Sequence, residues 1–236
     1  HHLLQYLEAS GRDATTLAGS IDGSAALEDE GLVQKLEETA SRLPRFRLLR
    51  IDGRNFTAEP ASRWLALVAA RFSAYLAQMK ARGWQTDRIV ERIQLCIPIG
   101  LDYFAEIARL RALKIVLANV ARHYGCQEVF LPQLVAHLNP AAQVDDANLN
   151  LIRATTQAMS AVLAGVDRLY VVPANAYTGE RATAFSRRMA RNVQHLLQLE
   201  SFMTQVVDPA AGSYYIEELT RILAQAAWSQ FQKMSS

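Results

Sequence analysis

The sequence predicts an α/β fold built on parallel strands, and two observations carry this prediction. Short apolar runs rich in β-branched residues alternate along the chain with longer stretches of helical period. These short runs are apolar along most of their length, as expected for strands whose two faces are both covered. Several of them also end in turn residues, such as Asp22-Gly23 and Asp52-Gly53.

The candidate elements follow one another in a regular order. Strands are expected at 17–21, 46–51, 93–99, 129–135 and 169–172. Helices are expected at 24–41, 60–82, 102–124, 148–165, 180–199 and 214–233. Apolar residues recur with helical spacing in the second and third of these helices, which indicates faces that pack into a core. They are Trp64, Val68, Phe72, Tyr75 and Met79, then Leu110, Leu113, Leu117, Val120 and Tyr124.

The alternation fits two architectures, the doubly wound sheet and the (β/α)8 barrel. Neither a GxGxxG segment nor a GxxxxGK[ST] segment occurs in the chain, which disfavours a nucleotide-binding version of the first. The candidate strands are too few to close a barrel of eight strands. Periodicity alone therefore leaves both architectures open.

Composition excludes several classes of function. The formal net charge is +2, and no long block of Lys and Arg occurs, so we expect no nucleic-acid partner. The cysteines, Cys96 and Cys126, have neither CxxC nor Cys/His spacing, and we expect no metal site. Few cysteines and the lack of a long apolar run predict a cytoplasmic protein that does not bind a membrane.

Two segments near the end of the chain carry a more specific signal. Residues 185–194 read FSRRMARNVQ, and residues 208–217 read DPAAGSYYIE. Both resemble the end of the barrel domain of the methylmalonyl-CoA mutase family, the coenzyme-B12-dependent acyl-CoA mutases. The likeness covers about residues 3–230, and further matching segments occur in the family's order. They are 17–22, 45–53, 93–100 with 103–112, 150–156 and 164–167.

This resemblance implies an incomplete (β/α)8 TIM barrel. The segments at 17–22, 45–53 and 93–100 are similar to the family's fourth, fifth and sixth strands, so the chain would supply strands four to eight with their helices. Residues 1–236 would form the C-terminal part of the barrel domain. The first three strands would lie upstream of His1, and the cobalamin-binding domain would lie outside this chain. The chain starts without Met, within a helical pattern, which fits this expectation.

The likeness fails at the strand ends, where the family performs its chemistry. Asp22 stands in place of the Gln that follows the fourth strand, and residues 23–33 lack the Arg that grips the substrate carboxylate. Arg54 and Asn55 replace the Tyr-His pair after the fifth strand, and Asn cannot donate a proton as imidazolium does. His137 lies near the family's His-x-Gln position with altered spacing. These degenerate positions predict that the chain has no catalytic residue.

Such a pattern resembles the small, non-catalytic subunit of the heterodimeric bacterial enzyme. That enzyme isomerises methylmalonyl-CoA to succinyl-CoA by radical chemistry. The resemblance implies a large catalytic subunit as partner, with adenosylcobalamin bound in the complex and not by this chain alone. The family's Asp-x-His-x-x-Gly cobalt-ligand segment does not occur in the sequence. Open sheet edges would also permit self-association of the fragment.

Surviving pocket contacts, if present, would come from residues that match the family motifs. They are Arg153, Ser186, Arg191, Asn192 and Gln194. Helix capping and packing explain the same residues equally well.

Two alternatives to the non-catalytic subunit remain at this stage. One is an active acyl-CoA mutase with a rebuilt pocket, in which Arg54 or Arg153 binds the substrate. The other is a generic barrel lyase or isomerase that uses Asp22, Asp52 and His137 at its strand ends.

Overall fold

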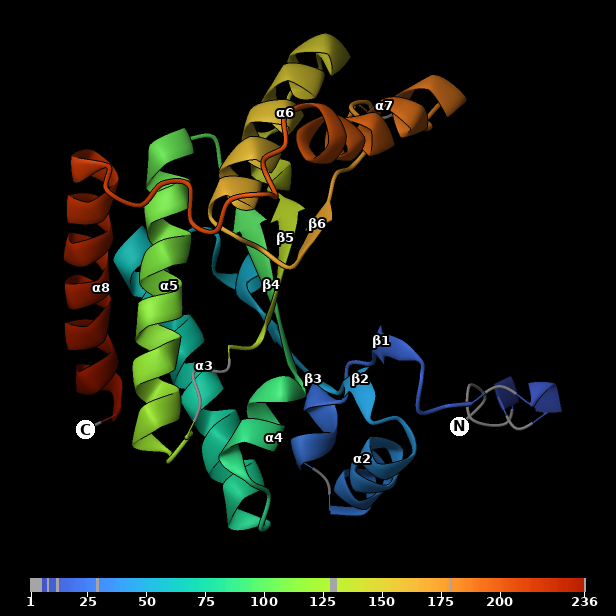
Figure 1. Ribbon diagram of the computed structural model, residues 1–236, viewed down its shortest axis with the longest axis vertical. Coiled ribbons are helices and arrows are strands. Elements are labelled where there is room, and N and C mark those ends of the chain that lie inside the picture. Colours follow the sequence, from blue (N-terminus) through green and yellow to red (C-terminus); the bar gives the residue numbers. More distant parts are fainter. Residues whose placement is uncertain are drawn as a thin grey trace.

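Parallel strands form the framework of the molecule. The computed structural model describes residues 6–7, 9–11, 13–28, 30–127, 131–178 and 180–235. A short sheet pairs β1 (Ala18–Ser20) with β2 (Arg45–Arg47), and a larger sheet has the order β3-β4-β5-β6. These strands span Leu49–Asp52, Ile93–Ile99, Gln133–Leu138 and Arg168–Tyr170. Every described strand pair is parallel, which confirms the α/β class (Figure 1).

Helices connect the strands in sequence. The α-helices are α2 (Glu30–Arg42), α3 (Ala61–Ala81), α4 (Thr86–Glu91), α5 (Tyr103–His123), α6 (Ala147–Leu163), α7 (Ala184–His195) and α8 (Tyr214–Ser235). Short 3₁₀ turns are η1 (Ser24–Glu28), η2 (Gly53–Phe56) and η3 (Pro140–Ala142), and a π-helical turn, η4 (Leu196–Glu200), continues α7. The long helices predicted at 60–82 and 102–124 are confirmed within one residue at each end.

The strand predicted at 46–51 is in fact two strands. Leu48 separates β2 from β3, and the backbone N–H groups of Leu48 and Leu49 both donate to the carbonyl of Arg92, at 2.7 and 3.0 Å. Two residues thus oppose one, as in a β-bulge, and the partner of the chain changes from β1 to β4 at this point. An apolar run gives no signal of such a break.

The strand predicted at 129–135 begins later than expected. Residues 128–130 lie outside the described part of the chain, and β5 runs from Gln133 to Leu138. Pro132 just before it has no N–H to donate to a ladder. His137 therefore lies inside the strand, opposite Pro98 and Tyr170, and not in a loop after it. The last predicted strand, 169–172, ends two residues early, at Tyr170.

Two helix predictions also need correction. The helix predicted at 180–199 starts at Ala184, where Thr183 and Ser186 form a reciprocal capping box that stops it from extending further back. Helix α4 was not predicted, because six residues are too few to display a helical period. The helix predicted at 24–41 splits into the turn η1 and helix α2.

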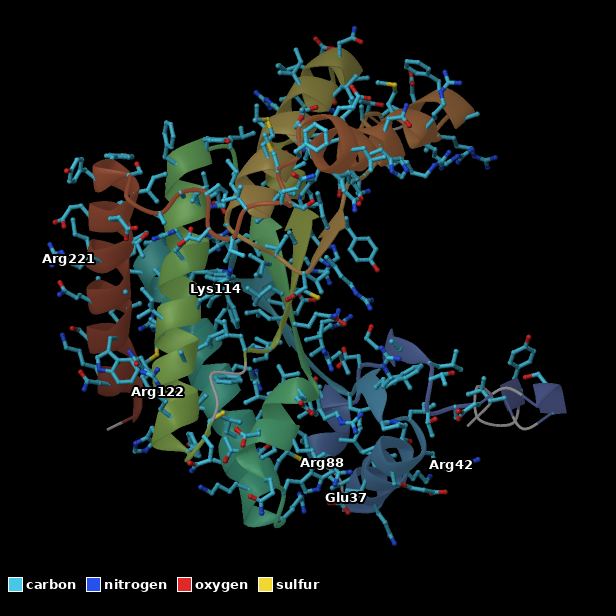
Figure 2. The ribbon with its side chains drawn as sticks, viewed as in Figure 1. Glu37, Arg42, Arg88, Lys114, Arg122 and Arg221 are labelled. Atoms are coloured by element: carbon cyan, nitrogen blue, oxygen red, sulfur yellow. The ribbon has the colours of Figure 1, made fainter. Side chains whose placement is uncertain are left out.

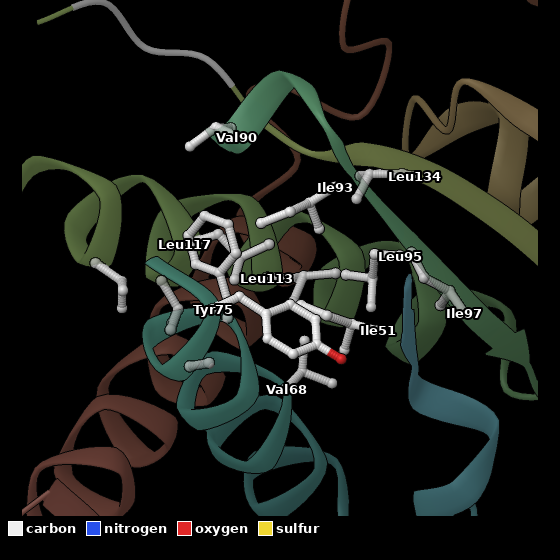
Figure 3. Packing of buried hydrophobic residues seen from close by; sticks show 14 of the residues in the cluster. Ile51, Val68, Tyr75, Val90, Ile93, Leu95, Ile97, Leu113, Leu117 and Leu134 are labelled. Carbon is white, nitrogen blue, oxygen red and sulfur yellow. The ribbon is translucent and has the colours of Figure 1, made fainter. Parts of the chain in front are cut away.

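Consecutive connecting helices cover the same face of the larger sheet. Helix α3 packs against α5, and α5 packs against α6, so the three lie side by side. Helix α8 packs over α3 and α5, and Figure 1 shows these three helices together on one side of the strands. Between helices and strands lies a continuous core of buried side chains, drawn in part in Figure 3. It includes Val68 and Tyr75 of α3, Leu113 and Leu117 of α5, and Ile51, Ile93, Leu95 and Ile97 of the strands.

The side chain of Arg92 joins α2 and β2 at the end of the sheet where β4 begins. Its side chain is 5% exposed, and its guanidinium donates to the carbonyls of Leu43 (2.9 Å), Phe46 (3.0 Å) and Ala40 (3.3 Å). Burial lowers the pKa of this guanidinium, and the positive charge of Arg88 adds to that effect. Arg92 thus fixes the end of α2 and strand β2 against the start of β4.

We predict that Arg92→Met lowers the free energy of unfolding by about 2–4 kcal/mol, because it removes the hydrogen bonds that the guanidinium donates to the carbonyls of Leu43, Phe46 and Ala40. Urea unfolding followed by circular dichroism measures this loss. Arg88→Met is the matched control: Arg88 is exposed and lies over the Trp84 ring, 5.0 Å from its centroid, a contact that contributes about 0.5–1 kcal/mol. Equal losses for the two variants would contradict the assigned role of Arg92.

Candidate functional site

The strand ends bring together side chains that are far apart in the sequence. Parallel strands place their carboxyl ends at one edge of a sheet, which is where α/β proteins hold their sites. Asp22 follows β1, Asp52 ends β3, and Arg54 and Asn55 lie in η2 directly after it. His137 lies near the end of β5, one strand beyond β4 in the same sheet, and within the electrostatic influence of Arg54 and Asp52. The degenerate positions named from the sequence thus belong largely to one region.

Asp52 and Arg54 bind each other through both ends of their charged groups. Arg54 Nε lies 2.8 Å from Asp52 Oδ1, and Arg54 Nη2 lies 2.6 Å from Oδ2. The Asp52 side chain is 16% exposed, and it also accepts the backbone N–H of Arg54 at 3.1 Å. These bonds lower the pKa of Asp52 and raise the pKa of Arg54. In this bidentate pair, the Nε and Nη2 donors of Arg54 are both used by Asp52.

Asp22 is held by a single ion pair with a residue of β3. Arg50 Nη2 lies 2.7 Å from Asp22 Oδ2, and both side chains are a little over one third exposed. Asp22 also accepts the backbone N–H of Ser24 at 3.2 Å. The two cationic groups of β3 and η2 that lie nearest the strand ends are therefore each paired with a carboxylate of this chain.

One face of the His137 imidazole is covered by an aromatic ring. Its ring stacks on Tyr170 of β6 with 4.8 Å between centroids and parallel planes, and its Nε2 is buried without a hydrogen-bond partner. Burial lowers the pKa of His137, and the positive charge of Arg54 lowers it further, while Asp52 acts in the opposite direction. A neutral imidazole at neutral pH follows, and a neutral ring is a poor proton donor.

Cys96 lies beside these groups and is not activated. It faces Asp52 in the register of β3 and β4, and Gln94 Nε2 lies 3.7 Å from its Sγ. Burial raises the pKa of the Cys96 thiol. A thiol with a raised pKa is a weak nucleophile. Among the described residues, no group of three or more His, Cys, Asp or Glu side chains could hold a metal ion.

The motif-matched residues lie in several separate places. Arg153 donates from Nη1 to the carbonyl of Ala142 at 2.7 Å, and so ties α6 to η3. Ser186 is the third helical residue of α7 and completes the capping box with Thr183. Arg191 and Asn192 have exposed side chains on α7. Gln194 lines a different cavity, between the end of α6, η4 and the segment before α8.

The segment 208–217 connects the start of α8 to α5 through ion pairs. Arg111 of α5 forms ion pairs with Asp208 and with Glu217, the latter at 2.7 Å. Glu217 also accepts the backbone N–H of Gly212 at 3.1 Å, which closes the turn before α8. The most distinctive motif of the sequence therefore has a structural role here, because it anchors the outer helix to the layer beneath.

Sequence reasoning missed two buried polar residues of α6. Asn150 is fully buried and bonds the backbone of Val144 on both its N–H and its carbonyl, and the carbonyl of Ala174. Gln157 is also buried and donates to the carbonyl of Ile99 at 2.5 Å. Together they fix the loops that follow β4, β5 and β6. The sequence signal for them was that both are polar side chains on the face of α6 that also carries Ala154, Ala158 and Ala161.

A family assignment follows from comparison with known sequences. The sequence model described as Methylmalonyl-CoA mutase matches residues 30–236. This chain belongs to the methylmalonyl-CoA mutase family. The motif resemblance noted from the sequence is thereby confirmed.

Individual relatives carry two kinds of name. The chain is 36% identical to the methylmalonyl-CoA mutase small subunit of Porphyromonas gingivalis, over 82% of this chain and 32% of that protein. It is 33% identical to the methylmalonyl-CoA mutase of Rhizobium meliloti, over 85% and 29%. It is 32% identical to a probable methylmalonyl-CoA mutase small subunit of Mycobacterium tuberculosis, over 99% and 40%. The chain thus spans 29% to 40% of the length of these mutase-family relatives.

We predict that the pKa of His137 lies below the ordinary value of about 6.5. Asp52→Asn should lower it further, since the nearby negative charge is lost, and Arg54→Gln should raise it. Titration of the ring followed by NMR measures all three values. A wild-type pKa at or above the ordinary value would contradict the burial of this ring.

The same lowering has a consequence for stability. Above about pH 6.5 the ring is neutral in both folded and unfolded chains and contributes nothing. As the pH falls below that value, the unfolded chain takes up the proton first, so stability falls until the folded pKa is reached, and below it the loss stays constant. His137→Gln should therefore flatten the dependence of unfolding free energy on pH in this window.

Proposed function

We propose that this chain acts as a non-catalytic partner in a methylmalonyl-CoA mutase, as the name small subunit suggests for several relatives. One observation carries the proposal: the guanidinium groups at the strand ends are already bound by the chain's own carboxylates. A substrate carboxylate needs a free cation with a bidentate fork. Arg50 and Arg54 offer none, and His137 is held neutral by burial.

We further propose that β1 to β6 correspond to strands four to eight of a (β/α)8 barrel, with β2 and β3 forming one strand together. The strands follow in chain order, and consecutive connecting helices lie on one face. A doubly wound sheet reverses its strand order and carries helices on both faces. Both features therefore support the barrel.

Adenosylcobalamin supplies the radical chemistry of mutases in which it is bound. The described residues of this chain do not fit it. His123 and His195 lie exposed at the ends of helices, and Nε2 of His137 is buried beneath Tyr170 beside the positive charge of Arg54. A cobalt ion beside this cation is disfavoured. We therefore propose that the cofactor, in a complete enzyme, is held by a large catalytic subunit.

The motif-matched residues receive structural roles in this proposal. Arg153 serves the loop after β5, and Ser186 caps α7. Arg191, Asn192 and Gln194 lie away from the strand-end cluster and line no part of the cavity beside Arg50. The alternative of an active mutase rebuilt on Arg54 or Arg153 loses support, because both guanidiniums have internal partners.

The expected partner is a protein, the large catalytic subunit of the mutase. Among the described residues, no helix is long and apolar enough to cross a bilayer. Cys96 and Cys126 are both buried and neither forms a disulfide, which agrees with a reducing compartment and with the cytoplasmic location proposed here.

The test is reconstitution of the mutase from separately purified subunits. The full-length product that carries this chain is mixed with the large catalytic subunit, and turnover of methylmalonyl-CoA is measured with adenosylcobalamin. We expect no turnover by this chain alone, co-purification of the two proteins, and a more stable, active complex. Turnover by this chain alone would contradict the proposal.

A further inference from the structure

A polar cavity of about 360 Å³ lies between the strand ends and α3. Its wall includes Asp22 and Ser24 after β1, Arg50 and Asp52 of β3, Asn55 of η2, and Arg71 and Tyr75 of α3. Its volume falls at the lower end of the range for pockets that hold small ligands, about 300–1,000 Å³. The wall presents two guanidiniums and the amide of Asn55, which are donors suited to an anion.

Arg50 is the best-positioned of these donors. Its backbone is fixed from two sides: its N–H donates to Ser24 Oγ at 2.8 Å, and its carbonyl accepts Ser24 Oγ at 2.9 Å and the Tyr75 hydroxyl at 3.1 Å. Tyr75 and Ile51 anchor this stretch in the core beneath (Figure 3). The stretch of strand that carries the guanidinium is therefore fixed by the chain's own contacts, without a ligand.

A carboxylate already lies on this guanidinium. Asp22 Oδ2 is 2.7 Å from Arg50 Nη2, and both residues line the cavity. The second acid of the wall, Asp52, is turned to Arg54, which holds both of its oxygens. The charge of Arg50, one of the two guanidiniums in the wall, is thus matched by one partially exposed side chain, that of Asp22.

We propose that this cavity is a binding site for a small carboxylate, and that Asp22 occupies its cation in the resting chain. The side chain of Asp22 imitates the carboxylate ligand, and it competes from within the chain at high effective concentration. A free carboxylate gains access to Arg50 when Asp22 is displaced or neutralised. Asp22 is in this view the residue that sets the low affinity of the site.

This inference goes beyond the subunit role and does not depend on it. Carboxylate binding by the purified protein requires no second subunit, so failure of either claim leaves the other standing.

The experiment is calorimetric titration of the full-length product with malonate. We expect Asp22→Asn to bind malonate at least tenfold more tightly than the wild type. Arg50→Gln added to Asp22→Asn should remove the gain, because the guanidinium is the group that Asp22 blocks. Glu218→Gln is the matched control: it frees Arg221, on the outer side of α8 (Figure 2), from its own ion pair, and neither residue lines the cavity.

Three results would overturn the proposal. They are an affinity of Asp22→Asn within threefold of the wild type, an equal gain for Glu218→Gln, and persistence of the gain without Arg50. Near-ultraviolet circular dichroism checks that each variant folds, and Asp22→Ser serves as a second neutralised variant. If neither Asp22 variant folds, Asp22 is a structural residue and not a displaceable occupant, which also overturns the proposal.

Discussion

The parallel register of β3, β4 and β5 is the constraint on which the rest of the structure depends. Side chains alternate along each strand, so pairing Asp52 with Cys96, and Pro98 with His137, sends polar and small groups to one face. The alternate residues, such as Ile51, Leu95 and Ile97, go to the face that α3 and α5 bury. One pattern of hydrogen bonds therefore creates both the core and the candidate site.

The chemistry of that site is decided by how its charges are satisfied. An Asp–Arg pair at a strand end is stabilised further when a backbone N–H also donates to the carboxylate, as at Asp52 and Asp22. The same pairs remove the free cation that a carboxylate substrate requires. A scaffold can thus keep its packing while its strand ends become inert, and a structural role in a larger assembly follows naturally.

How far the sequence could predict this depended on the range of the interaction. Long helices such as α3 and α5 were predictable because their apolar period repeats over many turns. The break at Leu48 was not, since it depends on one carbonyl of a distant residue, Arg92. The sequence likewise showed no sign that His137 is paired within β5 and does not lie in a loop.

In the candidate site, too, some features could be predicted from the sequence and others could not. The sequence identified Asp22, Arg54, Asn55 and His137 as changed positions, because each could be set beside a family motif. It could not predict that Asp22 binds Arg50, or that Arg111 joins Asp208 across 97 residues of chain, since opposite charges give no sequence signal of their partners. Nor could it assign the bond of Arg153 to Ala142, which replaces an expected ligand contact with a structural one.

The most direct measurement is the turnover of a reconstituted mutase in which this chain carries Arg54→Gln and His137→Gln together. If the strand ends of this chain perform no chemistry, the complex should turn over at the wild-type rate when both subunits are saturating. A loss of tenfold or more in the rate, with the complex still intact, would mean that these residues take part in catalysis and would contradict the account.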